Sequence, residues 1–172
     1  MSDTWIFGYG SLLWRPGFSF LECMPGWLDG WERRFWQGSP DHRGTPERPG
    51  RVVTLAPGER VWGLAFRLDA KTQRQTLQQL DAREVAGYQR LTAAIRGADR
   101  SVDAVAWVAT SDNPDWLGPA SVDTMAHQVI GARGASGTNV DYVLSLAEVL
   151  VGSRIRDPHV EALAARVRQL TA

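Results

Sequence analysis

Trp5-Ile6-Phe7-Gly8-Tyr9-Gly10-Ser11-Leu12-Leu13 is the stretch around which the rest of this 172-residue chain is organised. Its first three residues form an apolar, aromatic run typical of a buried strand. The turn that follows contains two glycines, which are free to adopt positive φ. A strand that ends in this way can present consecutive backbone N–H groups to an anion or to a developing oxyanion. The same residues also fit an N-terminal core strand followed by an ordinary glycine turn.

The composition is that of a single globular domain, and we expect residues 1–172 to form one. Apolar residues make up 44% of the chain and charged residues 22%, which is ordinary for such a domain. Nineteen basic residues balance nineteen acidic ones, which disfavours recruitment of nucleic acid or of an anionic membrane. No apolar run is long enough to span a membrane, and no secretory signal pattern opens the chain. With Cys23 as the single cysteine, we expect a cytoplasmic protein that acts on a small molecule.

The hydrophobic pattern changes from strand-like to helix-like along the chain. It predicts strands at 26–36, 51–55, 61–68, 88–95 and 102–110, with a hairpin turn at Pro57-Gly58. Helices are expected at 70–80 with Asp69 as N-cap, at 121–132, around 140–147 and at 158–170. Strands first and helices last favour an α+β fold: a mainly antiparallel sheet or small barrel with helices at one side.

Residues 38–50 stand out because thirteen consecutive positions hold almost no core-forming side chains. A structureless connection of this length in a compact domain is usually a binding loop or a disordered one. Its four charged residues, flanked by prolines, favour a lid that closes over a substrate.

Several kinds of site find no support in the sequence. The Gly8-Tyr9-Gly10 run begins like a dinucleotide fingerprint, but Leu13 occupies the third glycine position. The three histidines lack metal-ligand spacing with one another or with Cys23, so we expect neither metal nor cofactor. A Ser–His–Asp site built from Ser11 or Ser136 with His42 or His127 stays open, although neither serine lies in a Gly-x-Ser-x-Gly elbow.

Glu84 occupies an unusual position among the nineteen acidic residues. It lies where a predicted helix gives way to a strand, and apolar residues and then Gly87-Tyr88 follow it. A reversal of this kind places a side chain at the rim of a sheet, where a cleft raises the pKa of a carboxyl group. The neighbouring Arg83 offers the alternative of a plain ion pair. Position alone leaves both interpretations open.

Taken together, these segments resemble the ChaC-type gamma-glutamylcyclotransferases from about residue 5 to residue 150. Residues after about 151 carry no motif of that family. The motifs that carry the resemblance are, in chain order, Trp5-Ile-Phe-Gly-Tyr-Gly-Ser-Leu-Leu-Trp14, Arg33-Arg-Phe-Trp-Gln37, Ser39-Pro-Asp-His-Arg-Gly-Thr-Pro-Glu47, Pro49-Gly-Arg-Val-Val-Thr-Leu55, Arg83-Glu84 with Gly87-Tyr88, and Ser136-Gly137 with Asn139 and Tyr142.

The resemblance implies an enzyme that cyclises the γ-glutamyl unit of glutathione to 5-oxoproline and releases cysteinylglycine, without a cofactor. It implies Glu84 as the general acid/base, and it implies that Arg51 and Tyr142 either shape the pocket or touch the substrate. The γ-glutamyl group would be bound by Gly8, Tyr9, Gly10, Ser11, Leu12 and Leu13. Two alternatives remain: cyclisation of other γ-glutamyl amines, and a non-catalytic module that binds a γ-glutamyl ligand.

The implied chemistry also explains which residues are missing. The α-amine of the substrate attacks its own γ-carbonyl, so no protein nucleophile, metal or activated water is required. The protein must only move a proton and stabilise charge on the carbonyl oxygen, and one carboxylate and a few N–H donors suffice for these tasks.

Overall fold

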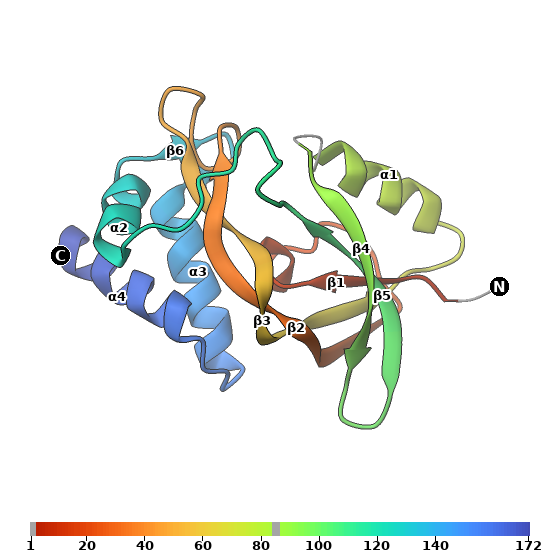
Figure 1. Ribbon diagram of the computed structural model, residues 1–172. Helices are drawn as coiled ribbons and strands as arrows, with labels where there is room; N and C mark the ends of the chain where they lie inside the picture. Colours follow the sequence, from red (N-terminus) through yellow and green to blue (C-terminus); the bar gives the residue numbers. More distant parts are fainter. Residues whose placement is uncertain (1–2, 84–86) are drawn as a thin grey trace. The chain divides into compact units, whose positions relative to one another are not determined.

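The computed structural model describes residues 3–83 and 87–172 (Figure 1). The described chain forms two compact units. Unit 1 comprises the described residues of 1–32 and 55–114, and unit 2 comprises 33–54 and 115–172. Because each unit is built from two separate segments, the chain crosses from one to the other three times. The expectation of one domain over residues 1–172 stays a prediction.

Five strands form a closed barrel in the order β1-β3-β2-β4-β5. β1 pairs antiparallel with β3 and parallel with β5, and this parallel pairing closes the ring. The neighbouring β4 and β5 form a regular hairpin that runs from Gln89 opposite Val108 to Arg96 opposite Ser101. The barrel confirms the predicted α+β class and small-barrel alternative. The strands are β1 (Trp5–Gly8), β2 (Glu22–Ser39), β3 (Gly50–Arg67), β4 (Gln89–Arg96) and β5 (Ser101–Val108).

The turn predicted at Pro57-Gly58 is wrong, because β3 continues through it without reversal. Gly58 permits a close approach instead: a Cβ at this position would lie 2.3 Å from Cγ of Glu32. Gly26, at the start of the predicted strand 26–36, lies inside β2, where a Cβ would lie 2.7 Å from Cγ2 of Ile95. At both positions a neighbouring side chain approaches the backbone so closely that there is no room for a Cβ, which is a common reason for glycine in a strand.

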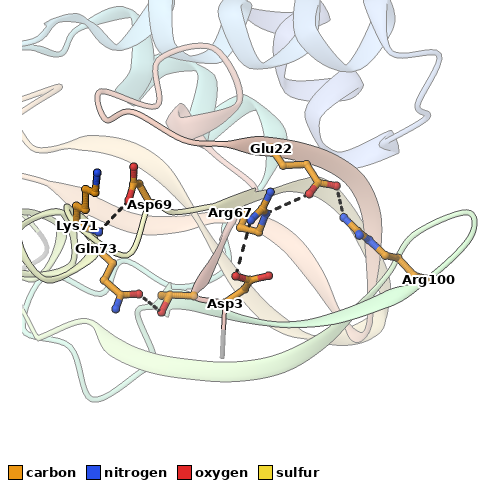
Figure 2. A network of polar contacts seen from close by, with 8 residues as sticks. Asp3, Glu22, Arg67, Asp69, Lys71, Gln73 and Arg100 are labelled. Carbon is orange, nitrogen blue, oxygen red and sulfur yellow. Dashed lines mark hydrogen bonds and ion pairs between the residues drawn. The ribbon is translucent and has the colours of Figure 1, made fainter. Parts of the chain in front are cut away.

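The first helix of unit 1, α1 (Gln73–Arg83), is shifted towards the C-terminus relative to the predicted 70–80. Asp69, expected as its N-cap, lies four residues before this start. Its carboxylate accepts a hydrogen bond from the backbone N–H of Lys71 (2.9 Å), and its carbonyl oxygen accepts from that of Gln73 (2.9 Å), so Asp69 stabilises the turn that leads into α1. The side chain of Gln73 also accepts a hydrogen bond from Thr4 at 2.6 Å (Figure 2). The start of α1 is thus attached to the segment that leads into β1.

A chain of ion pairs joins the ends of several strands in unit 1 (Figure 2). The carboxylate of Glu22 accepts hydrogen bonds from Arg67, at 3.1 Å, and from Arg100. Arg67 also faces Asp3 at 3.7 Å. These side chains are partly exposed, so solvent screens the pairs and their contribution to the free energy of unfolding is small.

The helices of unit 2 are α2 (Val122–Ile130), α3 (Asn139–Gly152) and α4 (Pro158–Thr171), which confirms the three helices expected here (Figure 1). A side-chain oxygen caps each start: those of Ser121, Thr138 and Asp157 accept hydrogen bonds from N–H groups three residues ahead. The expected inner stripe of the last helix is buried, namely Val160, Leu163, Ala164 and Val167. Among the described residues, no helix is both long and apolar enough to cross a membrane.

The break expected around residues 134–137 is a minimal hairpin of β6 (Arg133–Gly134) and β7 (Gly137–Thr138). Gly137 has φ of 116°, a value that L-residues with side chains rarely adopt. The backbone conformation therefore explains why glycine occupies position 137.

His159 lies at the start of α4 and is half-buried in unit 2. Its Nε2 accepts a hydrogen bond from the backbone N–H of Phe35 at 3.0 Å, and the two rings stack with centroids 5.8 Å apart. Burial and the positive charge of Arg34 lower the pKa of His159 from 6.5 to about 4. The ring is therefore neutral at pH 7, which its acceptor role requires.

We expect acid to destabilise the protein through this histidine. The unfolded chain takes up a proton on His159 below about pH 6.5, whereas the folded chain resists it down to about pH 4. The contribution of His159 to stability is therefore complete above pH 6.5 and is lost as the pH falls towards 4. Urea unfolding of wild type and His159→Gln at pH 7.5 and 5 tests this, with a smaller loss expected in the variant.

The exposed His127 provides the matched control, and His127→Gln should keep the pH dependence of wild type. An equal loss of stability in wild type and His159→Gln would contradict the prediction.

Candidate active site

The loop at the end of β1 folds back on the strand as a single 3-10 turn, η1 (Ser11–Leu13). The N–H of Leu13 donates to the carbonyl oxygen of Gly10 (3.0 Å), and those of Trp14 and Arg15 donate to that of Ser11. Of the six predicted binding residues, Gly8, Tyr9, Gly10 and Leu13 are buried, and Ser11 and Leu12 are half-buried.

The two glycines of this loop do not use the freedom expected of them, since neither Gly8 nor Gly10 has positive φ. Gly10 has φ of −127° and ψ of −126°, outside the helical and strand regions. Gly8 is required by packing: a Cβ there would lie 2.7 Å from Cβ of Leu12 and 3.3 Å from the ring of Phe66. Close contact with Leu12 and Phe66, and not a positive φ, therefore explains Gly8.

Tyr9 and Trp107 join this loop to β5. The buried hydroxyl group of Tyr9 donates to the carbonyl oxygen of Trp107 at 2.6 Å. The indole Nε1–H of Trp107 in turn donates to Oδ1 of Asp81, near the end of α1, at 3.0 Å. The carboxylate of Asp81 also accepts two hydrogen bonds from the guanidinium of Arg90 on β4, one of them at 2.9 Å from Nε. Chiefly because of this hydrogen-bonded guanidinium, the pKa of Asp81 is lowered and its charge is retained.

Apolar packing connects the same three elements. Ile6, Leu68, Leu80 and Trp107 form a buried cluster in unit 1. Residues of the loop, of α1 and of the segment before β4 pack against this cluster; they include Leu12, Leu77 and Tyr88.

The predicted general acid/base, Glu84, lies outside the described residues. The described chain resumes at Gly87, which has φ of 79° and would place a Cβ 3.2 Å from Nδ2 of Asn113. The glycine of the Gly87-Tyr88 motif therefore serves both backbone conformation and packing.

Arg51 and Tyr142 both contact Phe35 in unit 2. The guanidinium of Arg51 is buried and donates to Oε1 of Gln128 (2.7 Å) and to the carbonyl oxygens of Phe35 and Gly118 (2.9 Å each). Burial lowers the pKa of Arg51 from its usual value.

The ring of Tyr142 meets that of Phe35 edge to face at 6.1 Å, and its hydroxyl group accepts from the N–H of Val53 at 3.3 Å. The guanidinium of Arg43 lies over the same ring at 5.6 Å. Within unit 2, both predicted residues thus belong to a packed, hydrogen-bonded interior.

The structure brings together one of the Ser–His pairs that the sequence left open. Oγ of Ser136 lies 3.0 Å from Nδ1 of His42, whose Nε2 is 3.6 Å from the carboxylate of Asp41. Backbone hydrogen bonds of Ala135 and Ser136 to Asp41 and His42 accompany this contact. The side chains of His42 and Asp41 are 44% and 63% exposed, which favours a link between loop and hairpin over a shielded catalytic site. Among the described residues, no three potential ligands form a group that could hold a metal ion.

Comparison with known proteins relates this chain to one enzyme family. The family model described as ChaC-like protein matches residues 4–170. Glutathione-specific gamma-glutamylcyclotransferase 1 of Danio rerio is 42% identical over 173 residues, which cover 95% of this chain and 88% of that protein. Its Homo sapiens counterpart is 41% identical, over 92% of this chain and 76% of that protein.

The architecture is similar to a solved structure as well. The crystal structure of a glutathione-specific gamma-glutamyl cyclotransferase from yeast superimposes with a TM-score of 0.93. The two proteins are 25% identical, and the match covers 98% of this chain and 97% of the yeast chain.

We expect Gly8→Ala to lower the free energy of unfolding by about 1–3 kcal/mol, the usual cost of overpacking. The added methyl group would meet Cβ of Leu12, which no side-chain rotation can move away. Urea unfolding at pH 7.5 measures the effect. Gly152→Ala is the control, since a Cβ there meets nothing within 4 Å and its stability should not fall. A Gly8→Ala protein as stable as wild type would show that the approach is not a constraint.

Proposed function

This chain belongs to the ChaC-like protein family, and we propose that it is a glutathione-specific gamma-glutamylcyclotransferase. The observation that carries the proposal is identity of about 40% to enzymes of that name over more than nine-tenths of the chain. The reaction converts the γ-glutamyl group of glutathione to 5-oxoproline and releases cysteinylglycine.

The reaction is an internal exchange of one amide bond for another. The α-amine of the γ-glutamyl unit forms a bond to the γ-carbonyl carbon, and the bond from that carbon to the cysteine nitrogen breaks. The α-ammonium nitrogen loses two protons as it becomes the lactam N–H. The departing nitrogen gains one proton to leave as an amine and a second to become an ammonium group, so the protons balance, and because the nucleophile belongs to the substrate no water is consumed. Holding such a reactive conformer corresponds to effective molarities of roughly 10⁵–10⁸ M. The protein's main task is therefore to hold the substrate in position.

Glu84 is proposed to move the proton. The α-ammonium group has a reference pKa of about 8, so near neutral pH most substrate must lose a proton before it can attack. A carboxylate between the amine and the departing nitrogen can accept that proton and deliver one to the leaving group, for roughly 10²–10⁴-fold acceleration. The support for Glu84 is the family resemblance and its position directly after α1 in the sequence.

The loop formed by Gly8, Tyr9, Gly10, Ser11, Leu12 and Leu13 is proposed to bind the γ-glutamyl group. Its tight turn at the end of a buried strand supports this role, because such turns direct backbone N–H groups outward. These groups can stabilise the oxyanion or hold the α-carboxylate of the substrate, and both assignments remain open.

For Arg51 and Tyr142 we favour a role in maintaining the packing of unit 2 over direct contact with the substrate. The support is that the guanidinium of Arg51 already serves three protein acceptors and that Tyr142 is packed against Phe35. In the alternative, Arg51 binds the glycyl carboxylate of glutathione. The KM of an Arg51 variant for glutathione distinguishes the two roles.

A cytoplasmic location and a single domain over residues 1–172 complete the proposal. Cys23 is a free, exposed thiol, which suits a reducing compartment. The family model spans residues 4–170 in one match, which supports one functional domain.

The decisive test is formation of 5-oxoproline from glutathione by wild type and Glu84→Gln. The amide keeps the size of the side chain but cannot relay the proton, so kcat should fall at least about a hundredfold with binding retained. Glu148→Gln makes the same chemical change at an exposed site on α3 and should leave kcat unchanged.

Other outcomes would change the proposal in defined ways. Equal activity in wild type and Glu84→Gln would remove Glu84 as the base. Turnover of other γ-glutamyl amines but not of glutathione would keep the reaction and change the substrate. Binding without turnover of any of them would indicate a non-catalytic module.

Arg51→Ala should lower the free energy of unfolding by about 2–3 kcal/mol, because hydrogen bonds to a buried charged group are lost. KM for glutathione, measured at 20 °C where the variant is still folded, should stay within about twofold of wild type. Arg48→Ala, at an exposed position of the neighbouring loop, serves as the stability control. A KM raised about tenfold with unchanged stability would instead assign Arg51 to the substrate.

A further inference from the structure

Two parts of the proposed site are distant in the sequence, and the elements that precede them, β1 and α1, belong to the same unit. The loop of residues 8–13 follows β1, whereas Glu84 comes directly after α1. A proton relay requires that the base and the bound γ-glutamyl group be held in a defined geometry. The side chains that connect the loop to α1 are therefore candidates for residues that set this geometry.

Trp107 makes that connection with two different groups. Its backbone carbonyl oxygen accepts the hydroxyl hydrogen of Tyr9 at 2.6 Å, and its indole Nε1–H donates to Asp81 at 3.0 Å. The side chain is only 7% exposed, so packing fixes the direction of the indole N–H. Trp107 of β5 thus forms hydrogen bonds both to the loop, through Tyr9, and to α1, through Asp81.

Asp81 is oriented from two sides. Arg90 lies directly opposite Trp107 in the β4–β5 hairpin, and its guanidinium binds both carboxylate oxygens of Asp81 while lying 5.8 Å from the centre of the Trp107 ring. A forked guanidinium fixes the plane of a carboxylate as well as its position. Asp81 is therefore oriented as a defined acceptor for the indole N–H, three residues before Glu84.

Described residues that precede and follow Glu84 in the sequence contact the same apolar cluster of unit 1. Leu80 belongs to this cluster, and Tyr88 packs against it. Trp107 is itself a member. The indole of Trp107 is thus the part of the cluster that also makes a directional bond to α1.

We propose that Trp107 and Asp81 are positioning residues for the cyclisation, and that their hydrogen bond holds the end of α1 in register with the Tyr9 loop. This inference rests on the proposed function, because the geometry that it maintains is that between Glu84 and the bound γ-glutamyl group. Neither residue is assigned contact with the substrate.

A positioning role and a purely structural role differ in how much kcat changes relative to the free energy of unfolding. The ion pair of Asp81 and Arg90 is partly exposed (43% and 47%), so its loss should affect stability little. Rate is more sensitive to geometry, since a displacement of about 1 Å can cost a factor of about 10². A positioning role therefore predicts a loss of kcat that is larger than the loss of stability explains.

The test measures kcat and KM for 5-oxoproline formation in Trp107→Phe, Asp81→Ala and Asp81→Asn. Trp107→Phe keeps an aromatic ring and the carbonyl oxygen that binds Tyr9, and removes the N–H donor together with part of the buried ring volume, so its stability is measured in parallel. We expect kcat to fall about tenfold in Trp107→Phe and in Asp81→Ala, with KM within about twofold of wild type. Asp81→Asn keeps the oxygen acceptor and should retain kcat within about threefold.

The matched control is Asp29→Ala. Asp29 on β2 forms a similar exposed, two-bonded pair with Arg96 on β4 in the same unit. Its removal deletes an equivalent ion pair without touching Trp107, and kcat should be unchanged.

A double-variant comparison tests whether the two residues act through one bond. If they do, Trp107→Phe combined with Asp81→Ala should be no slower than either single variant, within about twofold. Multiplied losses would show that the residues act separately and would overturn the inference.

The inference and the proposed function fail in different ways. Wild-type kcat in both Trp107→Phe and Asp81→Ala, alongside an inactive Glu84→Gln, would overturn the positioning role and leave the function intact. No turnover of any γ-glutamyl amine by wild type would overturn both. Should Trp107→Phe fail to fold, the exposed Asp81→Ala, compared with Asp81→Asn and Asp29→Ala, still decides the question.

Discussion

The pairing of β1 on both of its edges is the constraint on which the candidate active site depends. This short strand lies between β3, with which it runs antiparallel, and β5, with which it runs parallel, and all four of its residues are buried. Because both edges are occupied, the end of β1 at Gly8 has a fixed place and direction. Close packing adds to this: a Cβ at Gly63 would lie 2.4 Å from the carbonyl oxygen of Gly8. The loop of residues 8–13 therefore starts from a rigid position.

A reaction in which the substrate attacks itself explains why rigid placement matters more here than reactive side chains. In the proposed cyclisation the nucleophile and the leaving group both belong to the substrate, so the protein would contribute orientation, a proton relay and charge stabilisation. Residues that carry out such tasks have ordinary chemistry. In unit 1 the residues proposed for such tasks include a glycine against which Leu12 packs and a tyrosine hydroxyl bound to a strand carbonyl. These residues matter because of where they lie in the fold. A search of the sequence for nucleophiles or metal ligands does not find residues of this kind.

Local sequence signals predicted much of the fold. The helices of unit 2 start where Ser121 and Asp157 cap them, and the buried stripe of α4 has the expected spacing. Residues whose role depends on a partner far away in the sequence have no such local signal. Pro57-Gly58 has the composition of a turn, but the reason for Gly58 is the side chain of Glu32, on another strand. The bond between Asp81 and Trp107 joins residues 26 positions apart, and neither has a local pattern that marks it. Glu84 could be singled out only by its place between two elements and by family resemblance.

The polar interior of unit 2 restricts what the loop between β2 and β3 can do. Arg43, at its beginning, is buried and donates to the carbonyl oxygen of Thr138 at 3.0 Å. At its end, the backbone of Arg51 exchanges two hydrogen bonds with the side-chain amide of Asn139. Gly44 and Gly50 then meet so closely that a Cβ on Gly44 would lie 2.2 Å from the backbone nitrogen of Gly50. Breaking these contacts would expose buried charged and polar groups at a cost of several kcal/mol. A closing movement over the substrate, which the sequence suggested for this loop, would therefore be confined to residues 45–48, where the exposed charges of the loop tip lie.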